Sequence, residues 1–470
     1  MKWFKFLIAF LVPIAGVMVC NNALDNDSWY VLAEGREIVE NGIYYEDQLS
    51  MHEGLEVTVQ NYGFAAIFYL VYQAFGPVGI YVGMLILNLI LCYLIYKICM
   101  LLSNKNINLS LLIMILTDLL LARWFVVTRA QMLSYIIMML LIYLLELYVK
   151  KGKTKLLWWV PILSLIQINL HASLWPIILI VLVIYLMGKG YKKTPLIATL
   201  ALSCLAGFLN PYGFRMMTFI LTSYGVSEAN KAIIELQAFN LDGNFNILLY
   251  MAIAGAMIFY IYGRRQRIRF RWLILIFGFL ALGLNTVKGM SHLILVLLFP
   301  LAAVYKNISM ERWGNRKIRW MAGSWAGVMA VTLIITIMVV RIPQVIDGPN
   351  EDMISAVDIL DKENVDKENA KIYSGFDDGG YLEYRGYKAY MDPRMEVFIK
   401  ANNGKEDIFK EWYNLRNGDI KKRDFLDKYE FDYLVTIESE KLYEPENDKY
   451  EMIFEVNDED REGVRVWKKV

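Results

Sequence analysis

The feature that most constrains this chain is a series of long apolar segments between the N-terminus and about residue 341. A transmembrane helix needs about 20 predominantly apolar residues, and eleven segments approach or exceed this length. They are residues 4–20, 77–101, 108–126, 131–149, 156–170, 172–187, 195–209, 246–262, 272–286, 290–306 and 319–341. We therefore expect an all-α polytopic membrane domain with about eleven transmembrane helices.

Composition supports a membrane protein and excludes one large class of partner. The chain is 57% hydrophobic and 20% charged, whereas soluble domains have about 45–50% apolar and about 25% charged residues. Its 48 basic and 47 acidic residues leave a net charge of +1. A nucleic-acid-binding protein needs a positive excess to neutralise phosphates, so we expect no nucleic-acid partner.

Lysine and arginine residues indicate the orientation. They collect in alternate loops, around residues 97–105, 150–155, 189–193, 264–271 and 306–319, whereas loop 21–61 has nine acidic residues and one base, Arg36. Because basic loops stay in the cytoplasm, we expect a multi-pass plasma-membrane protein with a cytoplasmic N-terminus. Residues 4–20 then form an uncleaved first span rather than a signal peptide. The first outer loop covers residues 21–76 and includes an interfacial helix at 62–75, which ends at Gly76-Pro77.

The C-terminal residues 342–470 are polar and belong to a different kind of domain. The patterns predict helices at 350–362, 404–416 and 418–428, and strands at 371–376, 381–384, 388–391, 431–437, 449–455 and 463–468. We expect a small extracytoplasmic α/β domain beside the membrane domain of residues 1–341. Within it, Gly379-Gly380 predicts a tight turn, and Asp392 with Arg394 predicts an internal ion pair.

Polar residues at the ends of the expected spans gather on the outer face. Ionisable groups are costly in membranes and often functional. The candidates are Asp25, Asp27, Gln60, Asn61, Arg129, Asn169, His171, Asn210, Lys288 and His292. A carboxylate there could take a proton from an acceptor hydroxyl, and the cationic groups could stabilise a phosphate leaving group. The expected substrate is a membrane lipid, an amphiphile whose anionic group lies at the outer leaflet.

Seven of the ten candidates also have a purely structural interpretation. Asp25 and Asp27 could cap the helix that begins near Ser28, and Arg129 could anchor a span end at the interface. Interfacial anchoring also accounts for Lys288 and His292, and a satisfied structural histidine accounts for His171. Asn210 precedes a proline, which favours a helix stop.

The run Asp25-Asn26-Asp27-Ser28-Trp29-Tyr30, followed by Glu34-Gly35-Arg36, resembles the first outer loop of GT-C glycosyltransferases. These multi-span enzymes use polyprenyl- or dolichyl-phosphate-linked sugars, and their oligosaccharyltransferase and protein mannosyltransferase branches carry an acidic pair after the first span. The resemblance implies that Asp27 is the catalytic acid or base and Asp25 its acidic partner. A divalent cation such as Mg²⁺ or Mn²⁺ at Asp25 and Asp27 is a further implication, because members of the superfamily differ in their metal requirement.

Further short motifs are similar to a poorly characterised bacterial group of GT-C-like membrane proteins. They are Gln60-Asn61-Tyr62, the run from Thr128 to Ser134, Asn169-Leu170-His171, Asn210-Pro211-Tyr212, Gly379-Gly380-Tyr381-Leu382 and Asp392-Pro393-Arg394. The chain lacks the Trp-Trp-Asp-Tyr-Gly acceptor motif of oligosaccharyltransferase, which disfavours protein N-glycosylation.

We therefore expect a membrane glycosyltransferase that moves a sugar from a polyprenyl-phosphate-linked donor to an extracytoplasmic glycan, lipid or protein acceptor. In this hypothesis Asp27 and Asp25 are catalytic. The donor phosphate is held mainly by Arg129 and His171, and the remaining candidates complete the site. A transporter or flippase, and a non-catalytic scaffold for envelope polysaccharide or lipid-linked intermediates, are the rival interpretations.

Overall fold

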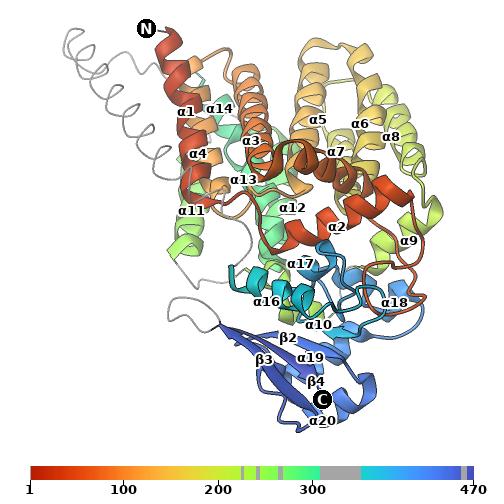
Figure 1. Cartoon of the computed structure of the whole chain (residues 1–470). Coiled ribbons are helices and arrows are strands. Elements are labelled where there is room, and N and C mark those ends of the chain that lie inside the picture. Colours follow the sequence, from red (N-terminus) through yellow and green to blue (C-terminus); the bar gives the residue numbers. More distant parts are fainter. Residues whose placement is uncertain (1, 224–226, 240–243, 263–267, 307–350, 457–462) are drawn as a thin grey trace, which may run out of the picture. The chain divides into compact units, whose positions relative to one another are not determined.

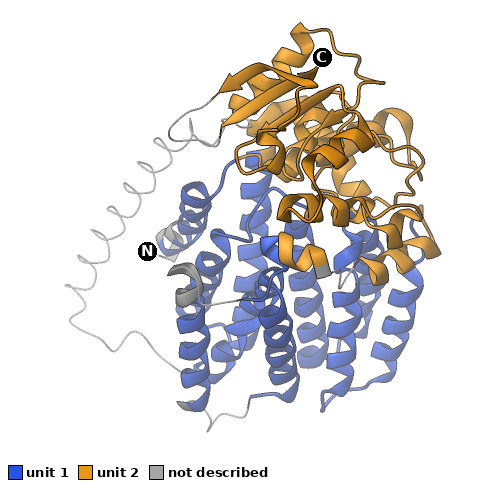
Figure 2. Ribbon diagram, turned by 90° about the horizontal axis from the view of Figure 1, so that it is seen from below, with its two compact units in different colours: residues 1–22, 81–210, 233–346 blue, residues 23–80, 211–232, 347–470 orange. Residues whose placement is uncertain are grey.

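The computed structural model describes residues 2–223, 227–239, 244–262, 268–306, 351–456 and 463–470. These residues are mostly helical, with one small sheet near the C-terminus (Figure 1). They divide into two compact units (Figure 2). The helical unit comprises residues 1–22, 81–210 and 233–346, and the mixed unit comprises residues 23–80, 211–232 and 347–470.

The helical unit is built from the expected apolar segments. Ten of the eleven segments form helices in the part of the chain that the structure describes. They are α1 (Lys2–Cys20), the second part of α3 (Tyr62–Leu102), α4 (Ile107–Ala122), α5 (Gln131–Lys151), α6 (Trp159–Leu170), α7 (Pro176–Met187), α8 (Thr194–Ala206), α11 (Asn244–Tyr262), α12 (Phe270–Asn285), and α13 (Met290–Leu297) with α14 (Phe299–Val304). The eleventh, residues 319–341, lies outside the described residues.

The length of these helices does not support about eleven transmembrane spans. Within the described residues, three are long and apolar enough to cross a membrane: Tyr62–Leu102, Gln131–Lys151 and Val287–Val304. The other helices formed by the expected segments have from 12 residues, in α6 and α7, to 19 residues, in α1 and α11, fewer than the ~20 that a typical bilayer requires. The predicted segments are longer than these helices because each segment also includes apolar residues of adjoining loops and one-turn helices. The expected orientation stays a prediction.

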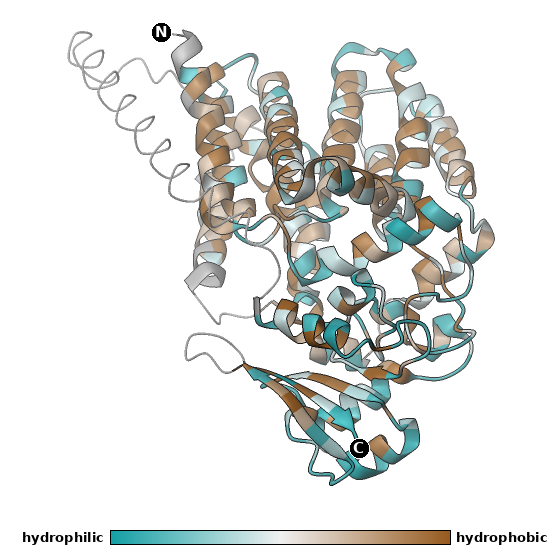
Figure 3. Ribbon diagram, in the orientation of Figure 1, coloured by the Kyte–Doolittle hydropathy of each residue, from teal (hydrophilic) through white to brown (hydrophobic). Residues whose placement is uncertain are grey.

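Apolar residues also cover outward faces of the helical unit, where a water-soluble bundle would carry polar residues. Figure 3 shows helices coloured as hydrophobic along much of their length. Exposed apolar side chains include Ile86 and Ile90 on α3, Leu116 on α4, Ile166 on α6 and Ile180 on α7. Helices that are hydrophobic all round are buried in protein or in a membrane, so this unit is compatible with membrane association.

The mixed unit joins the first loop of the chain to its C-terminal residues. Helix α2 (Asn26–Asn41) packs against α17 (Gly379–Tyr384), and a Cβ atom at Gly35 would lie 2.2 Å from the carbonyl oxygen of Ala65, at the start of α3. Gly76 breaks α3 with φ 62° and ψ −160°, where the sequence predicts the end of the helix at 62–75. This grouping differs from the expected division at residue 341, a position outside the described residues.

A four-stranded sheet forms the C-terminal part of the mixed unit, in the order β1-β2-β4-β3. Its strands are β1 (Ile372–Tyr373), β2 (Tyr433–Ile437), β3 (Tyr450–Val456) and β4 (Val464–Lys469). Strands β1 and β2 are parallel, and the other pairs are antiparallel, with Val435 opposite Val466. Ala389 forms isolated bridges with Ile372 of β1 and with Ser50 of the first loop. It therefore connects the first loop to the β1 edge of the sheet.

The helices of this part are α16 (Glu351–Lys362), α18 (Lys400–Asn403), α19 (Ile408–Asn417) and α20 (Lys422–Tyr429). Three of them confirm the expected helices at 350–362, 404–416 and 418–428. The expected strand at 381–384 is wrong, because these residues belong to helix α17. The expected strand at 388–391 is reduced to isolated bridges at Ala389.

The expected tight turn at Gly379-Gly380 is also wrong, because these residues begin α17. Their lack of a side chain serves close packing instead. A Cβ at Gly379 would lie 1.7 Å from the carbonyl oxygen of Met391, and one at Gly380 would lie 2.9 Å from the backbone nitrogen of Tyr30. Two adjacent glycines therefore let α17 approach both α2 and the following loop.

Candidate functional site

The ten predicted site residues divide between the two units. Those of the mixed unit are Asp25, Asp27, Gln60 and Asn61, and those of the helical unit are Arg129, Asn169, His171, Asn210, Lys288 and His292. The expected convergence of Asp27 with Arg129 and His171 stays a prediction.

In the helical unit, two predicted cationic residues share one carboxylate. Arg129 Nη1 lies 2.7 Å from Glu235 Oε1, and Lys288 Nζ lies 3.8 Å from Glu235 Oε2. All three side chains are partly exposed, at 24%, 39% and 40% for Arg129, Lys288 and Glu235. The two cationic side chains and the carboxylate are therefore accessible to a ligand from solvent.

Backbone hydrogen bonds hold the segment that carries Glu235. Glu235 lies in the one-turn helix η3 (Ile234–Leu236), and Lys288 lies in η4 (Val287–Gly289). The N–H of Val287 donates to the carbonyl of Gln237 at 3.0 Å, and the N–H of Phe239 donates to Leu284 at 3.3 Å. These bonds fix η3 beside η4, which accounts for the contact between Glu235 and Lys288.

The two predicted histidines of this unit are more deeply placed. His171 is 7% exposed and His292 is 3% exposed. Ser134 Oγ lies 2.9 Å from His171 Nδ1. Lys288 and His292 are close enough to His171 to interact with it electrostatically. The predicted residues Arg129, His171, Lys288 and His292 therefore belong to one neighbourhood, with cations toward solvent and imidazoles inside.

A small cavity lies among these buried groups. It has a volume of about 10 Å³ and is lined by Ser134, Gln167 and His292 together with apolar residues of α5 and α7. This is room for about one water molecule. The polar wall suits a water or a single oxygen atom, and the cavity is too small for a sugar.

Asn169 and Asn210, which belong to the same unit, bond to nearby backbone. The side-chain amide of Asn169 donates to the carbonyls of Leu165 and Leu209 at 2.7 and 3.0 Å, and that of Asn210 donates to Gly207 at 2.8 Å. Such bonds satisfy carbonyls that helix ends leave unpaired. For Asn210 this agrees with the helix-stop interpretation.

In the mixed unit, Asp25 has a clear structural role. It is the N-cap of α2: its carboxylate accepts from the Ser28 backbone N–H at 3.0 Å and from the Ser28 hydroxyl at 2.7 Å, and Ser28 Oγ accepts from the Asp25 N–H. Reciprocal bonds of this kind form a capping box. Asp27 lies two residues later in the first turn of α2 and is half-buried.

The expected cation at Asp25 and Asp27 gains no further ligand here. The described part of the chain contains no group of three or more His, Cys, Asp or Glu side chains arranged to hold a metal ion. Mg²⁺ and Mn²⁺ sites need several oxygen ligands in octahedral geometry, and the Asp25 carboxylate already serves the capping box. The metal ion at Asp25 and Asp27 stays a prediction.

Gln60 and Asn61 lie at the entrance to α3. Gln60 Nε2 donates to Glu396 Oε1 at 2.7 Å, and the carbonyl of Asn61 accepts from Ala65 at 2.8 Å. Glu396 is half-buried, and desolvation raises the pKa of its carboxyl group. The contact connects the first loop to the C-terminal residues rather than exposing a polar group for a ligand.

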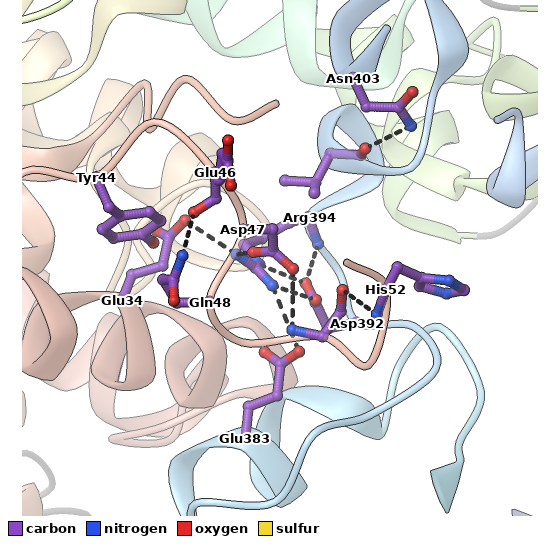
Figure 4. Close-up of polar contacts among 12 residues, drawn as sticks. Glu34, Tyr44, Glu46, Asp47, Gln48, His52, Glu383, Asp392, Arg394 and Asn403 are labelled. Carbon is purple, nitrogen blue, oxygen red and sulfur yellow. Dashed lines mark hydrogen bonds and ion pairs between the residues drawn. The ribbon is translucent and has the colours of Figure 1, made fainter. Parts of the chain in front are cut away.

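The largest polar network of the mixed unit surrounds Arg394, which is 1% exposed (Figure 4). Its guanidinium donates to Asp392 at 2.7 and 2.9 Å, to Asp47 at 2.7 Å and to Glu383 at 3.4 Å, and Glu34 lies 4.0 Å away. The expected ion pair of Asp392 with Arg394 is confirmed. Residues from the first loop and from the C-terminal part therefore share one buried cation.

Protonation keeps this network close to neutral. Burial raises the pKa of Glu34 to about 8, although Arg394 opposes the rise. Burial and the neighbouring Asp392 raise the pKa of Glu383 well above its usual range. Burial also disfavours ionisation of Asp47, but the guanidinium of Arg394 and hydrogen bonds from Ser50 outweigh it and lower the pKa. The two glutamates are thus mainly neutral at pH 7, whereas Asp47 supplies a negative charge beside Arg394.

Sequence reasoning missed Glu235, Ser134, Gln167 and the partners of Arg394 other than Asp392. Glu235 lies in a short polar stretch between apolar segments, where no local pattern marks its partner. Ser134 lies in the motif that contains Arg129, which is a signal that could have been used. Glu34 belongs to the motif of the first loop, but nothing in the sequence pairs it with residue 394.

Comparison with known proteins adds no assignment. No protein family matches the chain, and no curated protein matches it.

Proposed function

We propose that this protein is a membrane glycosyltransferase of the GT-C type, which transfers a sugar from a polyprenyl-phosphate-linked donor to an extracytoplasmic acceptor. The observation that carries the proposal is the grouping of Arg129, Lys288, His171 and His292 in the helical unit. Charged and neutral hydrogen-bond donors side by side, in a partly desolvated site, suit the phosphate of such a donor.

In this reaction Asp27 takes the proton of the acceptor hydroxyl, whose oxygen forms a bond to the anomeric carbon of the sugar. The bond from that carbon to the phosphate oxygen breaks, and its electron pair leaves with the polyprenyl phosphate. Arg129 and Lys288 stabilise the negative charge that develops on the phosphate. Asp25 positions Asp27 through the capping box at the start of α2.

The composition of the helical unit supports a membrane setting for this reaction. Three helices are long and apolar enough to span a membrane, and outward faces of α3, α4, α6 and α7 are apolar. The polyprenyl chain of the donor would lie against such faces, with its phosphate at the polar cluster. The proposal includes about eleven spans and an outward-facing site, neither of which the helix lengths show by themselves.

The transporter alternative depends on polar groups within the apolar helices. Glu146 of α5 accepts three hydrogen bonds from Arg271 at 2.5–2.7 Å and one from Tyr185 at 2.9 Å, and Asp118 of α4 accepts from Asn88 at 2.9 Å. A transport path needs polar groups that can exchange partners with a cargo. Because Arg271 and Tyr185 already hold the Glu146 carboxylate, the transferase is favoured.

Replacement of Asp27 by Asn tests the proposal. Full-length protein in lipid nanodiscs would be incubated with polyprenyl-phosphate-linked sugars extracted from bacterial membranes, and released polyprenyl phosphate measured by mass spectrometry. Loss of a general base lowers a rate by about 10²–10⁴-fold, so we expect that loss for Asp27→Asn. Asp424→Asn, which changes an exposed aspartate in the first turn of α20, is the matched control and should leave release unchanged.

Two results would contradict the proposal at different levels. Unchanged release with Asp27→Asn rejects the base but keeps a transferase. If the wild-type protein releases no polyprenyl phosphate from any lipid-linked sugar of the extract, yet moves labelled lipid between leaflets, the transferase is wrong and a flippase replaces it.

A further inference from the structure

Three buried polar groups form a continuous chain in the helical unit. Gln167 lies in the last turn of α6 and is 1% exposed, Ser134 lies in the first turns of α5 and is 6% exposed, and His171 directly follows α6. Gln167 Nε2 lies 2.8 Å from Ser134 Oγ and 2.7 Å from the His171 carbonyl oxygen. Ser134 Oγ lies 2.9 Å from His171 Nδ1.

The carbonyl at one end of this chain fixes the direction of every hydrogen bond in it. A carbonyl oxygen only accepts, so the Gln167 atom beside it is the amide nitrogen rather than the amide oxygen. The same nitrogen donates to Ser134, whose oxygen is therefore an acceptor in that contact. The Ser134 hydroxyl proton then has one acceptor within reach among the described residues, the ring nitrogen Nδ1 of His171.

It follows that Nδ1 of His171 is unprotonated and that a neutral imidazole carries its proton on Nε2. The hydrogen bond at one ring nitrogen decides the protonation of the other. The backbone keeps the ring in place, because the His171 N–H donates to the Gln167 carbonyl at 2.8 Å. No protein acceptor bonds to Nε2 in the part of the chain that the structure describes, so this N–H is available to a ligand.

We propose that Gln167 and Ser134 are positioning residues, which hold His171 as a neutral Nε2–H donor for a phosphate oxygen of the donor lipid. The inference rests on the proposed function, because that function supplies the anionic ligand. Lys288 and His292 are close enough to His171 to disfavour a charged ring there. Arg129 and Lys288 therefore balance the charge of the phosphate, and the N–H of His171 fixes the direction of one hydrogen bond to it.

This arrangement has a chemical purpose in the transfer reaction. A charged imidazolium at this position could lose its proton to the leaving phosphate, whereas a neutral imidazole keeps its N–H and donates a hydrogen bond throughout the reaction. Ser134 and Gln167, which hold His171, also line the small cavity, which has room for about one water molecule. Through its Nε2–H, His171 would select an oxygen acceptor in a defined direction, as a point charge such as Lys288 does not.

The three histidines of the chain, His52, His171 and His292, make the test direct. Full-length protein labelled with ¹⁵N-histidine is placed in nanodiscs, and the ring-nitrogen signals of His171 are assigned with His171→Gln. We expect one protonated Nε2 and one unprotonated Nδ1, unchanged between pH 6 and pH 8. Ser134→Ala should mix the two tautomers, and Ser134→Thr, which keeps the hydroxyl, should restore the wild-type pattern.

Decyl phosphate then probes the ligand. It should shift the Nε2 signal of His171 in the wild type, and the shift should weaken by at least several-fold in Ser134→Ala. A proton on Nδ1, a charged ring at pH 7, or decyl phosphate binding that leaves Nε2 unshifted would overturn the inference. Failure of decyl phosphate to bind the wild type at all would instead reject the proposed function, and the tautomer of His171 would still be measured.

Discussion

Each unit contains an arginine that contacts carboxyl groups, but the two arginines differ in how far they are exposed to solvent. Arg394 of the mixed unit is 1% exposed and faces four carboxyl groups, those of Glu34, Asp47, Glu383 and Asp392. Arg129 of the helical unit is 24% exposed and contacts Glu235.

This difference in exposure decides whether the arginine can exchange a protein carboxylate for an anion from solution. A fully buried cation cannot trade a protein carboxylate for an anion from solution, because the displaced carboxylate would remain desolvated. A half-exposed cation can make that exchange at little cost. The Arg394 network is therefore a structural centre that holds residues 34–47 to residues 383–394, whereas the Arg129 cluster is suited to binding.

The largest expected effect breaks the structural centre. Arg394→Met leaves Asp47 and Asp392 buried without a counter-ion, and loss of one partner of a buried pair costs about 3–5 kcal/mol. Thermal unfolding of the full-length protein in detergent, followed by tryptophan fluorescence, should show this loss for the mixed unit.

Two controls sharpen the contrast. Arg423→Met changes a side chain that is 81% exposed and should stay within about 0.5 kcal/mol of wild type. Arg129→Met should cost at most about 1 kcal/mol in the absence of ligand. If Arg129→Met destabilises the protein as much as Arg394→Met does, the two clusters do not differ in the way described.

The next effect is a pH dependence that belongs to Glu34. Its pKa is about 8 in the folded unit and 4.5 as the ordinary value. Between these two pH values the folded unit keeps a proton that the unfolded chain has released, so stability falls as pH rises. The contribution is at most about 1.4 kcal/mol per pH unit, and it levels off above pH 8.

Glu34→Gln isolates this contribution. Glu383 also has a raised pKa and contributes with the same sign, so the variant should flatten the slope between pH 5 and pH 8 without abolishing it. Asp47, whose pKa is lowered, acts only below about pH 4 and does not interfere. An unaltered slope in denaturant unfolding at several pH values would show that Glu34 is not a buried, protonated group.

The smallest effect tests partner exchange at the binding cluster. Glu235 competes with an incoming anion for Arg129 and Lys288, so Glu235→Gln should tighten binding of decyl phosphate by about two- to five-fold, which corresponds to about 0.5–1 kcal/mol for an exposed pair. Isothermal titration calorimetry on protein in nanodiscs would measure it. Weaker binding in this variant would mean that Glu235 positions the cations instead of competing for them.

Much of the secondary structure was predictable because its causes are local. The apolar segments form helices, and Gly76-Pro77 breaks α3 where the sequence predicts. Asp25 caps α2 through a residue three positions away. The strands at 433–437 and 464–469 form where the sequence predicts strands. The prediction failed at 381–384, where β-favouring tyrosines lie in a helix because the glycines before them let that helix pack against α2.

The candidate site was predictable by residue type and only in part by arrangement. Arg129, His171, Lys288 and His292 were chosen for their chemistry at span ends, and they share a neighbourhood in the helical unit. Their protein partners could not be chosen in the same way. Glu235 is 106 residues from Arg129, and no periodicity or motif connects the two positions.

The sequence by itself determined the helical character of the chain, its compatibility with a membrane and the ends of several helices, because these follow from hydrophobicity, proline and glycine geometry, and caps within a few residues. Only the tertiary structure decided that Arg394 meets carboxyl groups as distant in sequence as Glu34, that Glu235 faces two cations, and that Gln167 orders the protons of Ser134 and His171. Such contacts depend on how distant segments pack, and packing is set by the whole fold rather than by any one stretch of residues.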